Sequence, residues 1–254
     1  MFFNILGEDT RTLITFALLL LPASLYIMAL MKGRKGHYFF LSALAVHLVS
    51  MALRGLETGN IPLTEKHDTI SFMAFSTALA YWYATGRKEM KNLDLLALSL
   101  VAALIFVSFL HMPINTVSPF METPAFYLHT FFYFLSYGFF GIAACIGVLY
   151  MLEGNDELEG IQYRVMMHGW LFLSLSLVAG SVWFFVAHGT YWLWTSKELW
   201  TALMWFYYSL YLHARLIRGL RGRPAALLGS VGFAVALFTY FGVGTIIPSP
   251  PTQF

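Results

Sequence analysis

Long apolar runs, separated by short polar breaks, fill almost the whole chain. Each run has about the length that an α-helix needs to cross a bilayer, roughly 20 residues. The pattern therefore predicts an all-α fold: a polytopic membrane protein built as a bundle of about eight transmembrane helices. The predicted helices lie near 11–31, 36–54, 68–86, 94–112, 124–152, 162–188, 197–217 and 225–247.

The polar breaks between these runs differ in charge. Breaks 32–35, 87–91 and 215–223 are basic, whereas 55–67, 112–123 and 188–197 carry proline, glycine, asparagine and acids. The basic breaks fall on one side when the spans are counted, and the positive-inside rule assigns that side to the cytoplasm. Both termini and the break 188–197 are therefore expected on the outer side of the plasma (inner) membrane. Residues 1–10 lack the features of a cleaved signal peptide, so the first run is expected to remain a helix.

The composition is typical of a protein that uses lipid as its solvent. Hydrophobic residues make up 59% of the chain and charged residues 11%, which is too apolar for a soluble protein. Residues 1–254 are expected to form a single integral-membrane domain, in which the phenylalanine-rich segment 126–140 is interpreted as lipid-facing and packing surface. The basic stretch 215–223 is a topology signal and gives no support for nucleic-acid binding.

Three tryptophans stand close together in the break and helix start at 189–200: Trp192, Trp194 and Trp200. They have two physical interpretations, because indole is a large apolar ring with one N–H donor. They are either an aromatic belt at the membrane boundary or a platform for a planar ligand such as a porphyrin. Lys197 either pairs with Glu198 at the start of the following helix or contacts a haem propionate.

The tryptophan stretch reads G-x-Y-W-x-W-x-x-K-E-x-W, which resembles the WWD signature of the haem-handling cytochrome c assembly family that contains CcsA, ResC and CcmC. Further segments resemble that family in the same order along the chain: 59–64, 127–129 with 135–137, 163–164 with 179–183, 211–215 and 240–243. The resemblance covers most of the chain from Gly59 onward. It implies a membrane protein that holds haem at an outer tryptophan platform and delivers it, with a companion membrane subunit, to apocytochrome c.

The chain departs from the family pattern in two regions. Thr195 stands where the family has an aspartate after the second tryptophan, Ser196 where proline is usual, and His188 where a tryptophan precedes the glycine. The family also carries a histidine beyond its last helix, and 244–254 contains none. One axial haem ligand that the resemblance implies therefore has no counterpart.

Eight histidines occur in this apolar chain, and ionisable groups within membrane spans usually face a partner, a cavity or a cofactor. Haem iron takes one or two axial imidazoles. His129 matches the family's outer histidine, so the resemblance implies that it is a haem ligand. His188 ranks first as a replacement for the missing ligand, since it adjoins the platform, and His67 and His111 are alternatives. A five-coordinate or absent outer haem is also consistent with the sequence.

His213, in the segment Tyr-Leu-His-Ala-Arg, matches the family's membrane-embedded histidine. In the family the partner of that histidine is thought to come from a companion subunit. Within this chain, His168 is a candidate partner, because 162–188 and 197–217 are consecutive and antiparallel. His47 and His37 are further alternatives, and a core histidine bonded to a helical carbonyl is the competing interpretation of His168.

Two functions from different classes agree with these features. In the first, the chain handles haem for cytochrome c maturation, as part of a cytochrome c haem lyase complex with a companion subunit. In the second, it is an electron-transfer or quinol-reacting subunit of a larger multihaem complex, with one or two b-type haems and a quinone. Cys145 is the one cysteine, so the chain has no C-x-x-C-H motif and any haem that it binds alone is non-covalent. A haem-free assembly relative is a third interpretation.

Overall fold

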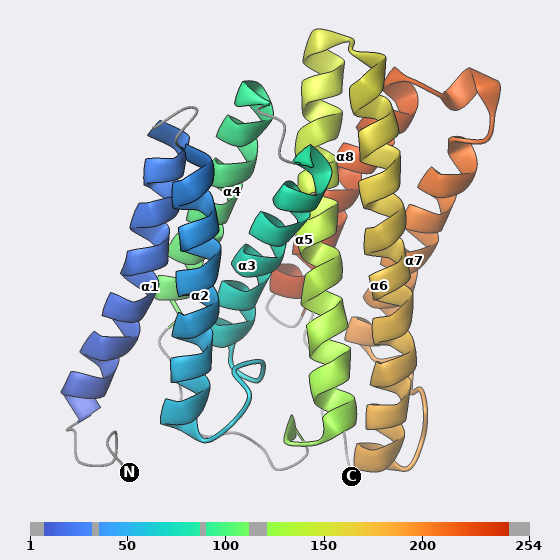
Figure 1. The fold of residues 1–254 in the computed structure, drawn as a ribbon. Coiled ribbons are helices and arrows are strands. Elements are labelled where there is room, and N and C mark those ends of the chain that lie inside the picture. The colour runs from blue at the N-terminus through green and yellow to red at the C-terminus, as the bar shows by residue number, and fades with distance from the viewer. Residues whose placement is uncertain (1–7, 32–35, 87–89, 112–120, 244–254) are drawn as a thin grey trace. The chain divides into compact units, whose positions relative to one another are not determined.

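The computed structural model describes residues 8–31, 36–86, 90–111 and 121–243 (Figure 1). Eight α-helices account for most of these residues: α1 (Glu8–Met31), α2 (Gly36–Thr58), α3 (Lys66–Thr85), α4 (Lys91–Phe109), α5 (Pro124–Glu153), α6 (Asp156–His188), α7 (Ser196–Ala214) and α8 (Arg223–Leu237). A 3₁₀ turn, η4 (Arg218–Leu220), precedes α8, and a π-helical turn, η5 (Phe238–Gly242), follows it.

The prediction of an all-helical, multi-pass membrane protein is confirmed. Each predicted span coincides with one helix, and five helices of the described residues are long and apolar enough to cross a membrane: α2, α4, α5, α6 and α8 with η5. The basic breaks at 32–35 and 87–89, the loop 112–120 and the C-terminal residues 244–254 lie outside the described residues.

Two compact units make up the chain, residues 1–122 and 123–254. In unit 1, α1 packs on both α2 and α4, and α3 also packs on both α4 and α2. In unit 2, α5 packs along most of its length on α6 and also on α8, while α7 lies against α6 and α8. All residues of the tryptophan-rich segment belong to unit 2, so the candidate site is described within that unit.

Helix α5 is the core of unit 2. Of the apolar stretch of α5, 78% is buried, against 11% for α6. Close packing depends on glycines: a methyl group at Gly147 would lie 2.2 Å from Gln162 Nε2, and one at Gly169 would lie 2.7 Å from the Phe140 ring. In the segment 126–140, interpreted as lipid-facing and packing surface, Phe134, Phe139 and Phe140 are buried and belong to the packing surface.

The turn between α5 and α6 explains why α6 begins six residues before the predicted span. Gly154 ends α5 with a left-handed backbone (φ 69°), and Asn155 caps α6 by accepting a hydrogen bond from the Glu157 N–H. Acidic residues in the first turn of α6 also stabilise the helix, because their negative charge lies at the positive end of the helix dipole. Polar, exposed first turns of this kind carry no hydropathy signal, so the apolar run marks only the later part of the helix.

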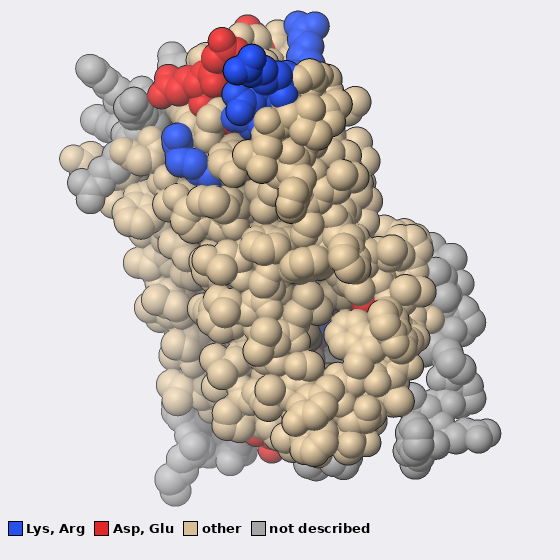
Figure 2. All heavy atoms as spheres, turned by 90° about the vertical axis from the view of Figure 1, so that its right-hand side faces the viewer, with Lys and Arg blue, Asp and Glu red and all other residues tan. Residues whose placement is uncertain are grey.

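Charged side chains gather at one end of unit 2. Figure 2 shows Lys, Arg, Asp and Glu clustered at one end of the face that carries α7, above a broad uncharged surface. The α5–α6 turn and the α7–α8 connection contribute this charge, and Arg215 forms an ion pair with Glu159 at 2.8 Å. The tryptophan-rich segment joins the opposite ends of α6 and α7. Unit 2 therefore has a charged end and an aromatic end, separated by an apolar belt.

Candidate functional site

The tryptophan loop, residues 189–195, is fixed at both ends by helix caps. Gly189 ends α6 with φ 72°, and Thr195 begins α7 through a capping box with Glu198. The Thr195 hydroxyl accepts from the Glu198 N–H, and the Glu198 carboxylate accepts from the backbone N–H of Thr195 at 2.7 Å and of Leu193 at 3.2 Å. Threonine and aspartate are both good N-cap residues. The substitution of the family's aspartate by Thr195 therefore retains the cap of α7.

The Glu198 carboxylate is thus directed into the loop, and in the part of the chain that the structure describes it makes no ion pair with Lys197. Adjacent helical residues do not face each other. Lys197 instead lines a cavity beside the loop. Of the two roles considered for Lys197, its position agrees with contact to an acidic ligand group.

The three predicted platform tryptophans have different surroundings. The Trp192 and Trp194 rings are nearly perpendicular (78°) with centroids 5.7 Å apart. Trp194 has a left-handed backbone (φ 57°) and is 69% exposed, a conformation that costs a bulky residue of order 1–3 kcal/mol. Trp200 packs against Phe238 of η5 at 4.7 Å. Trp192 and Trp194 therefore form a pair within the loop, whereas Trp200 contributes to helix packing.

A cavity of about 220 Å³ lies between the tryptophan loop, α5 and α6. It contains side chains of three predicted site residues: His129, Trp192 and Lys197. The Trp192 Nε1 is buried and has no hydrogen-bond partner among the described residues. A buried indole N–H normally has an acceptor, so Trp192 is an exception among the described residues. The other lining residues are Leu177, Gly180, Ser181, Trp183, Phe184, Tyr191, Thr195, Glu198 and Thr201.

His129 is held in one tautomer by Ser176. Its Nδ1 lies 2.9 Å from the Ser176 carbonyl oxygen and 3.0 Å from the Ser176 Oγ, and the Ser176 hydroxyl donates to the His129 carbonyl oxygen at 2.9 Å. A carbonyl oxygen only accepts, so Nδ1 carries the proton. The lone pair is therefore on Nε2, which is the arrangement of a histidine that is oriented by one ring nitrogen and ligates metal with the other.

Two residues that sequence reasoning did not single out shape the surroundings of His129. A methyl group at Gly180 would lie 2.6 Å from His129 Nδ1, so only glycine lets the ring lie against α6. The Trp183 ring is parallel to the imidazole (8°) at a centroid distance of 6.3 Å. Gly180 and Trp183 lie in the segment 179–183, whose likeness to the family was the available signal. Ser176 lies outside it and gave none.

His188 belongs to the same aromatic cluster but does not line the cavity. It stacks on Phe184 at 4.2 Å and meets the Trp183 ring edge-on at 6.2 Å. Trp183 therefore contacts both His129 and His188.

The other two candidates for the missing outer ligand belong to unit 1. His111 donates its Nδ1 proton to the carbonyl of Val107 at 2.9 Å. His67 makes the same three contacts with Ser108 that His129 makes with Ser176: Nδ1 to the carbonyl oxygen at 3.0 Å, Nδ1 to Oγ at 3.2 Å, and serine hydroxyl to the histidine carbonyl at 2.8 Å. The chain thus contains two equivalent histidine–serine clasps, one in each unit.

Helices α6 and α7 are joined by a pair of tryptophan–serine hydrogen bonds. The Trp170 indole donates to Ser209 at 2.8 Å, and the Trp205 indole donates to Ser174 at 2.9 Å. Each serine is four residues after the tryptophan of its own helix and donates to that tryptophan's carbonyl oxygen. These bonds fix the antiparallel register of the two helices.

This register places the two predicted inner ligands at similar depth but on different faces. His168 and His213 differ by about two residues, or roughly 3 Å, along the helix axes. The face of α6 toward α7 is marked by Trp170 and Ser174. At 100° per residue, His168 lies about 140° around α6 from that face. Its ring contacts Phe139 of α5. His213 is exposed on α7 and donates its Nδ1 proton to the Ser209 carbonyl at 2.7 Å. The structure therefore does not bring them together.

His37 and His47, the other candidate partners of His213, lie on α2 in unit 1. Both ring nitrogens of His47 have partners, Ser71 at 3.1 Å and Tyr26 at 3.5 Å. Within the described residues, no cluster of three or more His, Cys, Asp or Glu side chains could hold a metal ion.

Comparison with known proteins identifies the family of the chain. The family model described as cytochrome C assembly protein matches residues 63–248. The cytochrome c biogenesis protein CcsA of Chlamydomonas reinhardtii is 26% identical over 217 residues, covering 77% of this chain and 62% of the algal protein. CcsA of Prochlorococcus marinus (strain AS9601) is 44% identical over 89 residues, covering 35% of this chain and 29% of that protein. The chain therefore spans less than two thirds of the length of these relatives.

Proposed function

Because the chain belongs to the cytochrome c assembly protein family, we propose that it handles haem for cytochrome c maturation at the cavity of unit 2. It presents haem on the outer side of the plasma membrane to apocytochrome c, together with a companion membrane subunit. The family membership and the names of the CcsA relatives support the pathway. The observation that carries the site is the His129–Ser176 clasp, which presents an unprotonated Nε2 beside the tryptophan loop.

The residues around the cavity fit non-covalent haem. His129 Nε2 would hold the iron through its lone pair, and Trp183 and Trp192 would supply flat apolar surface. The Lys197 ammonium would supply the positive charge that a propionate carboxylate requires. Bound haem would supply an iron that accepts an axial nitrogen and vinyl groups that react with cysteine thiols.

The contribution of the chain is orientation rather than acid–base chemistry. Ser176 and Gly180 set the tautomer and position of His129, so its lone pair is available without rearrangement. The capping box of α7 holds the tryptophan loop beside the cavity. The thiols come from the apocytochrome, since Cys145 is the one cysteine of this chain.

A second haem in series within this chain has no support in the geometry of unit 2, because His168 and His213 lie on different faces of their helices. His213 is exposed on α7, where a histidine of a companion subunit has access to it. We therefore keep cytochrome c maturation as the proposed function and assign His213 to an interface with that subunit.

A maturation assay tests this function. The chain is expressed with its companion subunit in a bacterium that lacks its own maturation system, and covalent haem on a reporter cytochrome c is measured after denaturing electrophoresis. We expect His129→Ala to lower the yield at least tenfold. We expect His111→Ala, at a histidine of unit 1 whose Nδ1 bonds to the Val107 carbonyl, to leave the yield within twofold of the unmodified chain. Equal yields from His129→Ala and the unmodified chain would exclude His129 from the function.

A further inference from the structure

Unit 1 buries a group of polar and ionisable side chains that the haem site does not use. Arg54, His67, Asp68, Ser71 and His47 are each at most 6% exposed. In a membrane-spanning bundle such groups are costly, and they usually mark an ion or proton pathway. They come from α2 and α3, which pack against each other.

An ion cluster lies at the junction of α2 and α3. The Arg54 guanidinium donates to Glu57 at 3.1 Å, to Glu65 at 3.3 Å and to Asp68 at 3.3 Å. The side chains of Glu57, Glu65 and Asp68 are 5%, 10% and 4% exposed, and Glu57 and Glu65 adjoin the loop between the helices. The cluster is therefore buried and extends from this loop into the interior of unit 1.

His47 lies deeper in the same unit. It is 11 residues before the end of α2, a depth of about 16 Å at the helical rise, which is about half of a bilayer's hydrocarbon thickness. Its Nε2 lies 3.1 Å from Ser71 Oγ, and its Nδ1 lies 3.5 Å from Tyr26 Oη. Since one nitrogen of neutral imidazole donates and the other accepts, this chain of bonds can run in either direction.

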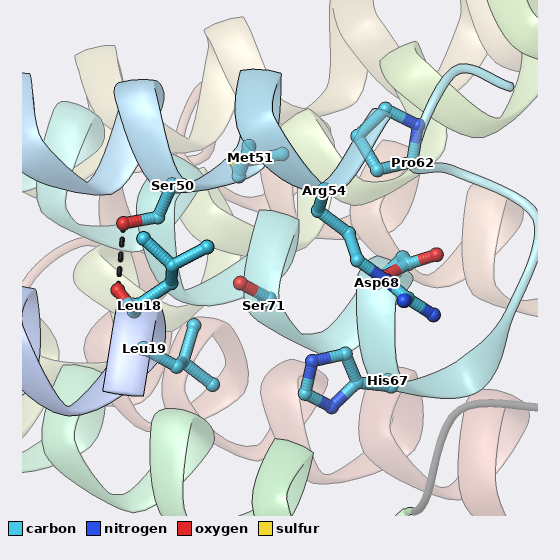
Figure 3. A pocket seen from close by; sticks show the side chains of 9 residues that line it. All are labelled: Leu18, Leu19, Ser50, Met51, Arg54, Pro62, His67, Asp68 and Ser71. Carbon is cyan, nitrogen blue, oxygen red and sulfur yellow. Dashed lines mark hydrogen bonds and ion pairs between the residues drawn. The ribbon is translucent and has the colours of Figure 1, made fainter. Parts of the chain in front are cut away.

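A small cavity lies beside the ion cluster and is also lined by Ser71, the partner of His47 (Figure 3). Its volume is about 20 Å³, and a water molecule needs roughly 10–15 Å³ together with two to four polar partners. Arg54, Asp68, His67 and Ser71 line it, and all four are labelled in Figure 3. The remaining lining residues are Leu18, Leu19, Ser50, Met51 and Pro62.

We propose that this cavity holds a water molecule that completes a proton-transfer path from the α2–α3 junction to His47. The water accepts a proton from the protonated Asp68 carboxyl, which becomes a carboxylate, and gives one of its own protons to Ser71 Oγ. Ser71 in turn gives its hydroxyl proton to His47 Nε2. Only O–H and N–H bonds form and break, no electrons are transferred, and the reverse steps restore the starting state.

The groups that face His47 agree with a proton path that reaches it through Ser71. Tyr26 of α1 lies on the Nδ1 side, and Phe75 of α3 packs edge-on at 5.6 Å. Ser71 is the polar group on the Nε2 side, and the charged groups Arg54 and Asp68 line the same cavity as Ser71, together with His67. The path lies wholly in unit 1 and needs no haem, so its test is independent of the function proposed for unit 2.

Hydrogen exchange at the His47 ring tests the path. The full chain is labelled with ¹⁵N-histidine in lipid bilayers, the His47 signal is identified by its loss in His47→Phe, and the imidazole N–H exchange rate is followed by solid-state NMR after transfer to D₂O. We expect Ser71→Ala and Asp68→Asn to slow this exchange at least tenfold. Ser76→Ala is the matched control, because Ser76 is also buried on α3 but lies outside the path; its exchange rate should stay within twofold of the unmodified chain.

Two results would overturn the proposal. One is an exchange rate in Ser71→Ala equal to that of the unmodified chain, and the other is equal slowing by Ser76→Ala. A measurement on the unmodified chain guards against variants that fail to fold: magnetisation transfer from water protons to the His47 ring should be observed, and its absence would also contradict the path.

Discussion

Gly180→Ala is expected to displace His129 without removing any predicted ligand. The added methyl would lie 2.6 Å from Nδ1 and 2.9 Å from Cε1 of the ring, whereas ordinary contacts are at least 3.4 Å. The ring must therefore move by roughly 1 Å, which takes Nδ1 beyond hydrogen-bonding distance of the Ser176 carbonyl, now at 2.9 Å.

The size of the effect follows from three contributions. The lost hydrogen bond costs about 1 kcal/mol, and overpacking costs about 1–3 kcal/mol. Replacement of a helical glycine by alanine returns about 1 kcal/mol. The net destabilisation is about 1–3 kcal/mol, and loss of the orienting bond should weaken haem binding about 10–100-fold.

Gly160→Ala is the matched control, since it lies on the same helix and its methyl would meet only Arg164 Nη1, at 3.9 Å. Thermal unfolding and haem titration of both variants are measured in detergent. Gly160→Ala should be as stable as the unmodified chain or slightly more stable, with unchanged haem affinity. The reasoning is refuted if Gly180→Ala binds haem within twofold of Gly160→Ala and unfolds at the same temperature.

Three further substitutions test other parts of the structure. Thr195→Ala should destabilise α7 by about 0.5–2 kcal/mol, whereas Thr195→Asp should retain the cap; unfolding temperatures of the pair decide this, and equal losses would contradict it. Gly147→Ala places a methyl 2.2 Å from Gln162 Nε2 and 2.9 Å from the Ala226 carbonyl, so a loss of at least about 1–3 kcal/mol is expected in the same assay. Trp205→Phe removes the indole bond to Ser174 and should cost about 1 kcal/mol. Ser174→Ala should cost a similar amount, and the double variant should cost little more than either single one in a double-mutant cycle.

The helices were predictable because each long apolar run has the length of a membrane-spanning helix. Their caps at Gly154, Asn155 and Thr195 were not predicted and were found in the structure. Burial was not predictable in the same way. Helices α5 and α6 have nearly the same mean hydropathy, 1.9 and 2.0, yet 78% of one apolar stretch and 11% of the other are buried. A helix that is apolar all round carries no periodic signal for its packed face.

The candidate site was predictable in part. The sequence indicated His129, Trp192 and Lys197, and the structure brings these three to one cavity. Trp200 could not be distinguished from them, because its role depends on a contact with Phe238 that is distant in sequence. The separation of His168 from His213 depends on helix rotation, which the depth of a residue along the chain does not reveal.

Haem titration of the purified chain with an imidazole rescue tests the central claim most directly. Optical spectra are recorded for the unmodified chain, His129→Gly and His111→Gly in lipid nanodiscs, with and without added imidazole. We predict that His129→Gly loses at least tenfold in haem affinity along with its histidine-ligated spectrum, that imidazole restores both, and that His111→Gly resembles the unmodified chain. A His129→Gly variant that binds haem with unchanged affinity and spectrum would contradict the account.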